Sequence, residues 1–162
     1  MKPVVGACAS DTLRFTFAEE LKAQKWLDRQ LATGKRFIFQ PYLETVETSG
    51  EWSSIYFGSE LSHCVQKIPV KGDYRVQDDF GATDRFVDPT EVPEMLEISD
   101  KVIKYLQNRF DDVLVTRLDY LQMSSGEFVI NEVEMIEPSL FLRHSPTLAS
   151  EILLQEIRSL LH

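Results

Sequence analysis

The sequence has little of what several classes of protein need. It has only two cysteines among 162 residues, Cys8 and Cys64, and they lie far apart without a metal-binding spacing, so reduced thiols and a cytoplasmic location are expected. No stretch resembles a signal peptide or a membrane-spanning helix. Acidic residues outnumber basic ones by 26 to 17, and this excess argues against nucleic acid or an anionic membrane as the main partner.

Nucleophilic groupings are missing as well. No Ser/His/Asp or Cys/His arrangement stands out, so the sequence predicts no covalent catalysis by a protein nucleophile. His63 and His144 lie outside any metal-ligand spacing and are expected to make ordinary polar contacts.

What the sequence does contain is typical of one α+β domain over residues 1–162. Hydrophobic residues make up 43% of the chain, which is enough for a sizeable core. Helices and strands are predicted in mixed order, so an antiparallel sheet with flanking helices is expected. The predicted helices are 19–31, 94–110 and 147–161, and the predicted strands are 36–42, 52–57, 61–68, 112–121 and 127–135. The polar segment 71–93 is predicted to be a functional loop.

Apolar and acidic residues alternate near the end of the sheet. Phe128, Ile130, Glu132 and Glu134 occupy every second position, and residues i and i+2 of a strand point to the same face. Glu132 and Glu134 should therefore lie side by side, with Asp119 facing them from the preceding strand. Three converging carboxylates need a compensating cation, and hard oxygen ligands suit Mg²⁺ or Mn²⁺. From these residues alone, a solvated strand face is an equally open alternative.

Four separated pieces of the sequence together resemble the C-terminal half of the ATP-grasp superfamily. The resemblance is to the branch near bacterial glutathione synthetases and ribosomal-protein glutamate ligases, and to a group that includes a cyclo-ligase of cycloserine biosynthesis. The pieces, in order, are Lys2-Pro3 before a small-residue loop, Gln40-Pro41-Tyr42-Leu43, Lys71-Gly72-Asp73-Tyr74-Arg75-Val76-Gln77, and Arg117-Leu118-Asp119 with Asn131-Glu132-Val133-Glu134. Gly50-Glu51-Trp52-Ser53 and Glu134 to Leu140 resemble the cycloserine group in particular.

The resemblance implies a nucleotide site in the first part of the chain. It gives Lys2 a contact to the nucleotide phosphates, and it makes Gln40, Tyr42 and Leu43 part of the hinge that holds adenine. Glu47 is implied for the ribose hydroxyls. The alternatives are an ordinary terminal lysine at position 2, and a buried strand end at Tyr42 and Leu43.

Basic residues further along are implied to steady transferred phosphate. Arg75 resembles the arginine that stabilises the γ-phosphoryl group and the acyl-phosphate, because a guanidinium fork matches that spread of charge. Lys67 could add a second positive charge, and Gln77 could support the same site. Arg117 is expected to pair with the carboxylates or to contact a phosphate. An alternative for Arg75 is a surface ion pair.

The metal positions implied by the resemblance are Asp119, Glu132 and Glu134, although relatives commonly have Asn at the last of these. Glu137 lies outside the register and is interpreted as structural or substrate-side. The implied activity is ATP-dependent ligation of a small-molecule carboxylate to an amine-type substrate, or a related cyclo-ligation, through an acyl-phosphate, with ATP and Mg²⁺ or Mn²⁺ as cofactors.

Three alternatives remain open at this point. The chain begins as though within a strand-to-loop element, which predicts a fragment lacking an N-terminal substrate lobe. It would then be a non-catalytic nucleotide-binding domain or one half of a split ligase. A more distant alternative is a metal-dependent hydrolase that uses the same acids and does not depend on ATP.

Overall fold

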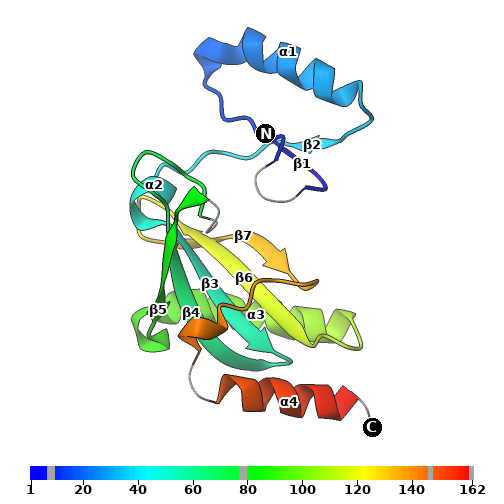
Figure 1. Ribbon diagram of the computed structural model, residues 1–162, viewed down its shortest axis with the longest axis vertical. Coiled ribbons are helices and arrows are strands. Elements are labelled where there is room, and N and C mark those ends of the chain that lie inside the picture. Colours follow the sequence, from blue (N-terminus) through cyan, green and yellow to red (C-terminus); the bar gives the residue numbers. More distant parts are fainter. Residues whose placement is uncertain (7–9, 77–79, 146–147, 161–162) are drawn as a thin grey trace. The chain divides into compact units, whose positions relative to one another are not determined.

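The computed structural model describes residues 1–6, 10–76, 80–145 and 148–160 (Figure 1). It divides the chain into two compact units, Met1–Tyr42 and Leu43–His162. Within the described residues, every helix is too short or too polar to cross a membrane.

The first unit is one helix beside a short two-stranded sheet. Helix α1 (Glu20–Leu31) follows the 3-10 turn η1 (Phe17–Glu19), and β1 (Lys2–Pro3) pairs antiparallel with β2 (Phe37–Ile38). Trp26 of α1 packs edge-on against Phe37, with the ring centroids 5.3 Å apart. The helix prediction is confirmed, but the strand predicted over 36–42 is too long. Pro41 has no N–H to donate to a strand ladder.

The second unit is a five-stranded antiparallel sheet with helices on both faces, which confirms the predicted fold class. The strand order is β5-β4-β3-β6-β7. The strands are β3 (Glu51–Phe57), β4 (Glu60–Ile68), β5 (Thr83–Val87), β6 (Val115–Gln122) and β7 (Phe128–Glu134). The helices are α2 (Val46–Ser49), α3 (Pro93–Arg109) and α4 (Ala149–Leu160), with 3-10 turns η3 (Pro89–Glu91) and η4 (Leu142–His144).

The long loop predicted over residues 71–93 is wrong in part. Strand β5 lies within it and pairs with β4, so the sheet has one more edge strand than expected. The strand escapes the sequence pattern because its residues are mostly polar, and only Val87 is fully buried. Polar edge strands of this kind resist pairing with other chains. Gln77 lies outside the described residues.

One face of the sheet is covered by α3 (Figure 1). Met95, Ile103 and Leu106 of this helix are buried, at the spacing of an amphipathic helix. Met95 and Ile103 pack with residues of β3, β4, β6 and β7 into the larger hydrophobic cluster, whose strand members include Tyr56, Cys64, Leu118, Tyr120 and Phe128. This cluster sets the position of the strands that carry polar side chains on the opposite face.

The opposite face has an apolar half next to α4. Ile55, Phe57 and Val65 are fully buried there and pack against Ala149 of the helix and against Val115. We call these five residues the apolar half. The same strands continue into a charged half, described below.

A β-bulge in β7 separates its apolar residues from its acidic ones. Asp119 pairs with Glu132, whereas Tyr120 pairs with Ile130, so Asn131 is an extra residue between the two pairs. Phe128 consequently lies on the α3 face, edge-on to Tyr120, while Glu132 faces the same way as Asp119. Simple alternation along β7 would have placed Phe128 and Glu132 on one face.

Candidate functional site

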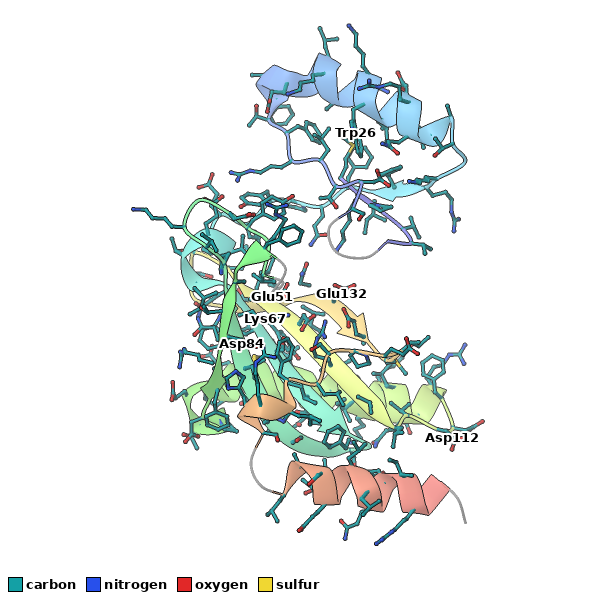
Figure 2. All side chains as sticks on the ribbon, viewed as in Figure 1. Trp26, Glu51, Lys67, Asp84, Asp112 and Glu132 are labelled. Carbon is teal, nitrogen blue, oxygen red and sulfur yellow. The ribbon has the colours of Figure 1, made fainter. Side chains whose placement is uncertain are left out.

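The charged half of the sheet is built from facing positions on four strands. Its residues are Glu51, Ser53, Lys67, Arg117, Asp119, Glu132 and Glu134. Figure 2 labels Glu51, Lys67 and Glu132 among them. Those on β3, β4 and β6 are buried, whereas Glu132 is exposed. Phe141 lies between this half and the apolar half, with its ring centre 5.8 Å from both the Lys67 ammonium and the Arg117 guanidinium. Four acids and two bases therefore share one patch of the sheet, and the burial of its members on β3, β4 and β6 costs them hydration.

Asp119 is the centre of this group and is only 2% exposed. Its Oδ1 accepts hydrogen bonds from Ser53 Oγ at 2.5 Å and Arg117 Nε at 3.0 Å, and lies 3.2 Å from Lys67 Nζ. Burial alone would raise the pKa of Asp119, but the Lys67 and Arg117 charges lower it below its ordinary value. The carboxylate is thus held ionised and fixed in orientation.

Arg117 joins three parts of the chain. Its Nη2 donates to Asp119 Oδ2 at 2.9 Å and lies 2.7 Å from Glu134 Oε1, and its Nη1 donates to the Ser139 carbonyl at 3.1 Å. Partial burial raises the pKa of Glu134, although the Arg117 charge opposes that shift. The expectation that Arg117 pairs with the carboxylates is confirmed, and its contact to a phosphate stays a prediction.

Lys67 is enclosed by two acids. Its ammonium forms an ion pair with Glu51 on the opposite strand as well as with Asp119. Burial alone would lower the pKa of Lys67, yet the two carboxylates raise it, whereas burial raises the pKa of Glu51 itself. Gly50 precedes this pair in a left-handed conformation (φ 69°), and a Cβ there would overlap the Lys67 carbonyl, so glycine is required at that position.

The three predicted metal ligands do converge. One carboxylate oxygen from each of Asp119, Glu132 and Glu134 lies within 4.8 Å of the other two. Such a set of hard oxygen donors fits Mg²⁺. Charge also fits, because the four acids of the charged half exceed its two bases by two negative charges. The role of these residues as metal ligands stays a prediction.

Arg75 has partners of its own within the segment before β5. It forms an ion pair with Asp73 at 2.6 Å, and its guanidinium lies 3.8 Å from the centre of the Phe80 ring. The Arg75 side chain remains 38% exposed. The hydrogen bonds from Arg75 lower the pKa of Asp73. The surface ion pair left open by the sequence is therefore present, and a role toward phosphate stays a prediction.

The residues implied for nucleotide binding lie in both units. Lys2 is on β1 opposite Ile38, and Gln40 and Tyr42 follow β2. The Arg14 guanidinium lies 3.7 Å from the centre of the Tyr42 ring. In the second unit, Leu43 precedes α2 and Glu47 is on it. This one-turn helix was absent from the sequence prediction. The roles of all five predicted residues stay predictions.

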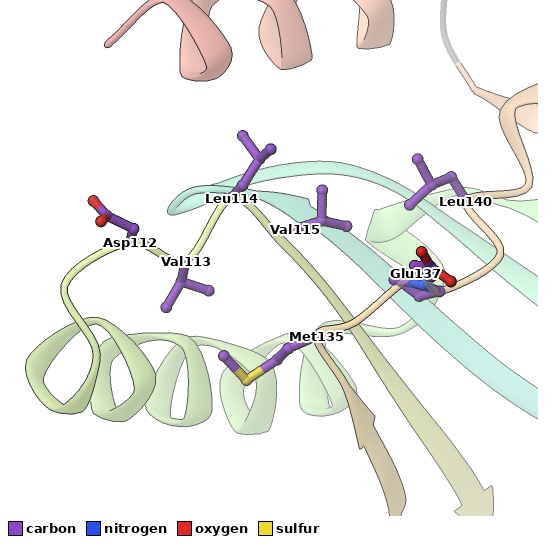
Figure 3. A pocket seen from close by; sticks show the side chains of 8 residues that line it. Asp112, Val113, Leu114, Val115, Met135, Glu137 and Leu140 are labelled. Atoms are coloured by element: carbon purple, nitrogen blue, oxygen red, sulfur yellow. The ribbon is translucent and has the colours of Figure 1, made fainter. Parts of the chain in front are cut away.

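A cavity of about 310 Å³ lies where β7 ends (Figure 3). Most of its lining is apolar, including Met135 and Leu140, and Glu137 and Asp112 add the carboxylates. Glu137 adopts a left-handed conformation (φ 52°) just before Pro138. Its structural or substrate-side role stays a prediction.

Both histidines of the second unit that the sequence singled out have ordinary polar partners. His63 Nε2 lies 2.9 Å from the Leu140 carbonyl, and its Nδ1 lies 2.8 Å from Ser62 Oγ. His144 Nε2 lies 2.9 Å from an Asp84 oxygen. The prediction for both is confirmed. The sequence did not predict that Glu51 and Ser53 belong to the charged half, or that Asn131 contacts it through Glu51.

Comparison with known proteins adds a fold and a set of relatives. No protein-family model matches the chain. The cycloserine biosynthesis protein DcsG of Streptomyces lavendulae is 28% identical over 150 residues, which cover 90% of this chain and 49% of DcsG. The crystal structure of D-cycloserine synthetase DcsG superposes with a TM-score of 0.80 at 25% identity, over 99% of this chain and 55% of that one. The chain therefore has the fold of D-cycloserine synthetase DcsG.

A second ATP-grasp structure shares the fold at lower similarity. The ligase PsnB, complexed with a phosphomimetic variant of its minimal precursor, Mg and ADP, superposes with a TM-score of 0.59 at 17% identity, over 96% of this chain and 45% of PsnB. The chain therefore spans about half the length of the relatives it matches. The resemblance seen in the sequence, including the cycloserine group, is confirmed.

Proposed function

We propose that this chain is the ATP- and Mg²⁺-binding part of an ATP-dependent carboxylate–amine ligase, or of a related cyclo-ligase, that works through an acyl-phosphate. The observation that carries the proposal is the convergence of Asp119, Glu132 and Glu134 in an ATP-grasp fold. The excess of two negative charges in the charged half supports a divalent cation there.

Each residue of the site would contribute positioning or charge. Asp119, Glu132 and Glu134 would hold the metal, and Arg117 would keep Asp119 and Glu134 together. Mg²⁺, when bound, supplies charge neutralisation at the β- and γ-phosphate oxygens of ATP. Arg75 would steady the transferred phosphoryl group, because its guanidinium is partly exposed and offers a planar set of donors.

Residues of the first unit would serve the nucleotide. Lys2 would contact its phosphates, and Gln40 and Tyr42 would hold adenine together with Leu43. These roles rest on the resemblance to the superfamily. The carboxylate and amine substrates would be small molecules, and DcsG suggests a cyclo-ligase substrate as one class to try first.

Isothermal titration with Mg-ATP tests the proposal. The wild-type chain should bind, and Glu132→Ala/Glu134→Ala should lose that binding. Glu94→Ala/Glu97→Ala, which removes two exposed acids from α3 on the opposite face, is the matched control and should bind as the wild type does. Absence of binding by the wild type would overturn the nucleotide assignment.

Assays of ADP release with candidate carboxylates and amines address the alternatives. Release that depends on both substrates supports a ligase. Binding without release supports a nucleotide-binding half that needs another chain. Hydrolysis without ATP would support the metal-dependent hydrolase instead.

A further inference from the structure

Glu51 is the buried acid of the charged half that belongs to no metal-ligand group. It begins β3 directly opposite Lys67 of β4 and is 8% exposed. One carboxylate oxygen pairs with the Lys67 ammonium. The other accepts a hydrogen bond from Asn131 Nδ2 at 2.8 Å. Both oxygens are thus engaged by groups that themselves adjoin the proposed metal ligands.

Lys67 and Asn131, the two partners of Glu51, each adjoin a different proposed metal ligand. Lys67 Nζ lies 3.2 Å from Asp119 Oδ1, so its ammonium is shared between Glu51 and Asp119. Asn131 is the extra residue of the β7 bulge and immediately precedes Glu132. Glu51 therefore acts on the carboxylate group from two sides, as a positioning residue and not as a ligand.

Buried ion pairs often stabilise a fold no more than well-packed apolar residues of similar volume do, so stability alone does not account for the Glu51–Lys67 pair. The effect of the pair on the net charge of the remaining acids offers a reason for its presence. With Glu51 present, Lys67 neutralises Glu51, and the remaining acids keep an excess of two negative charges over Arg117. Without Glu51, the Lys67 charge would fall on Asp119 alone, and the excess would drop to one.

We propose that Glu51 sets the charge available to a divalent cation by holding Lys67 away from full pairing with Asp119. This inference rests on the proposed metal site. It requires that the replacement of Glu51 and the replacement of Lys67 change the affinity for the metal in opposite directions. Glu51→Gln should weaken binding, and Lys67→Met should strengthen it. The double variant Glu51→Gln/Lys67→Met, which restores the excess of two, should bind as the wild type does.

Titration with Mn²⁺, used as a paramagnetic substitute for Mg²⁺ and followed by electron paramagnetic resonance, measures these affinities without ATP or turnover. We expect Glu51→Gln to bind about tenfold more weakly, as a change of one unit charge within this cluster implies. The double variant should return to within about threefold of the wild type. Urea unfolding of each variant reports its stability separately.

A purely structural role for the pair predicts a different pattern. Both single variants would then weaken Mn²⁺ binding in step with their loss of stability, and that result would overturn the inference. If Lys67→Met does not fold, the double variant decides, because removal of both charges together is tolerated by buried pairs. Binding by the double variant as weak as by Glu51→Gln would also overturn it. A wild-type chain that binds no Mn²⁺ would refute the metal site itself.

Discussion

On the sheet face opposite α3, the same strands carry an apolar half and a charged half. Along β3 the face changes from Glu51 and Ser53 to Ile55 and Phe57, and along β4 it changes from Lys67 to Val65. The apolar half buries its residues against α4, which is the ordinary source of stability. The charged half is also buried on β3, β4 and β6, but there the buried groups depend on ion pairs and hydrogen bonds with one another.

The difference separates stability from function on one surface. Burial of Asp119 and Lys67 costs hydration that their mutual attraction barely offsets. Apolar side chains at the same positions could be buried without this loss of hydration. The composition of the charged half is therefore explained by the metal site that we propose there.

Replacement of Asp119 should have the largest effect because it breaks the charged half at its centre. Asp119→Asn removes the buried partner that Lys67 and Arg117 share, and leaves each of these bases with one carboxylate. We expect a loss of about 3–5 kcal/mol in the free energy of unfolding, measured by urea denaturation, together with loss of Mg-ATP binding. A loss below about 1 kcal/mol, the range of exposed ion pairs, would show that the charged half is hydrated.

Replacement of Phe57 tests the apolar half. Phe57→Ala removes a fully buried ring beside α4, and the free energy of unfolding should fall by about 3–5 kcal/mol. Mg-ATP affinity should be unchanged at temperatures where circular dichroism shows the native fold. Weaker binding by the folded variant would mean that the two halves are coupled.

Two β-bulges, one between β3 and β4 and one between β6 and β7, limit how much of the charged half could be predicted from the sequence. The β-rich runs at 52–57 and 61–68, with Gly58-Ser59 as the turn between them, predict the hairpin correctly. A regular ladder from that turn would place Glu51 opposite Gln66. The structure has an extra residue between the pairs Ile55–His63 and Tyr56–Leu61, and this shift brings Lys67 opposite Glu51 instead.

The bulge in β7 likewise limits what the sequence predicts of the candidate site. Glu132, Glu134 and Asp119 could be predicted to converge, because each neighbouring pair follows simple strand geometry. Asn131 could not be placed beside Glu51, since its position depends on the register shift in β7. Strand β5 was missed for a different reason, namely that an edge strand with polar residues lacks the apolar alternation that marks a buried one.

The stability of the wild type should depend on pH through a group near the apolar half. Burial lowers the pKa of His63, so the folded chain keeps this imidazole neutral where the unfolded chain, with a pKa of about 6.5, binds a proton. Stability is therefore fully present above pH 6.5 and falls as the pH drops toward the lowered folded pKa. Urea unfolding at several pH values should show a shallower decline for His63→Gln than for the wild type. Equal pH dependence of the two would exclude this origin.

Replacement of Glu132 should have the smallest effect on stability and a large one on binding. Its side chain is exposed at the edge of the charged half, so Glu132→Gln should change the free energy of unfolding by no more than about 0.5 kcal/mol. Because it removes one of the three proposed ligands, Mg-ATP should nevertheless bind more weakly in a calorimetric titration. That result is the reverse of the one expected for Phe57→Ala. If Glu132→Gln left binding intact, the metal would have to be held by the more buried acids, and the exposed edge of the charged half would be a solvated strand face after all.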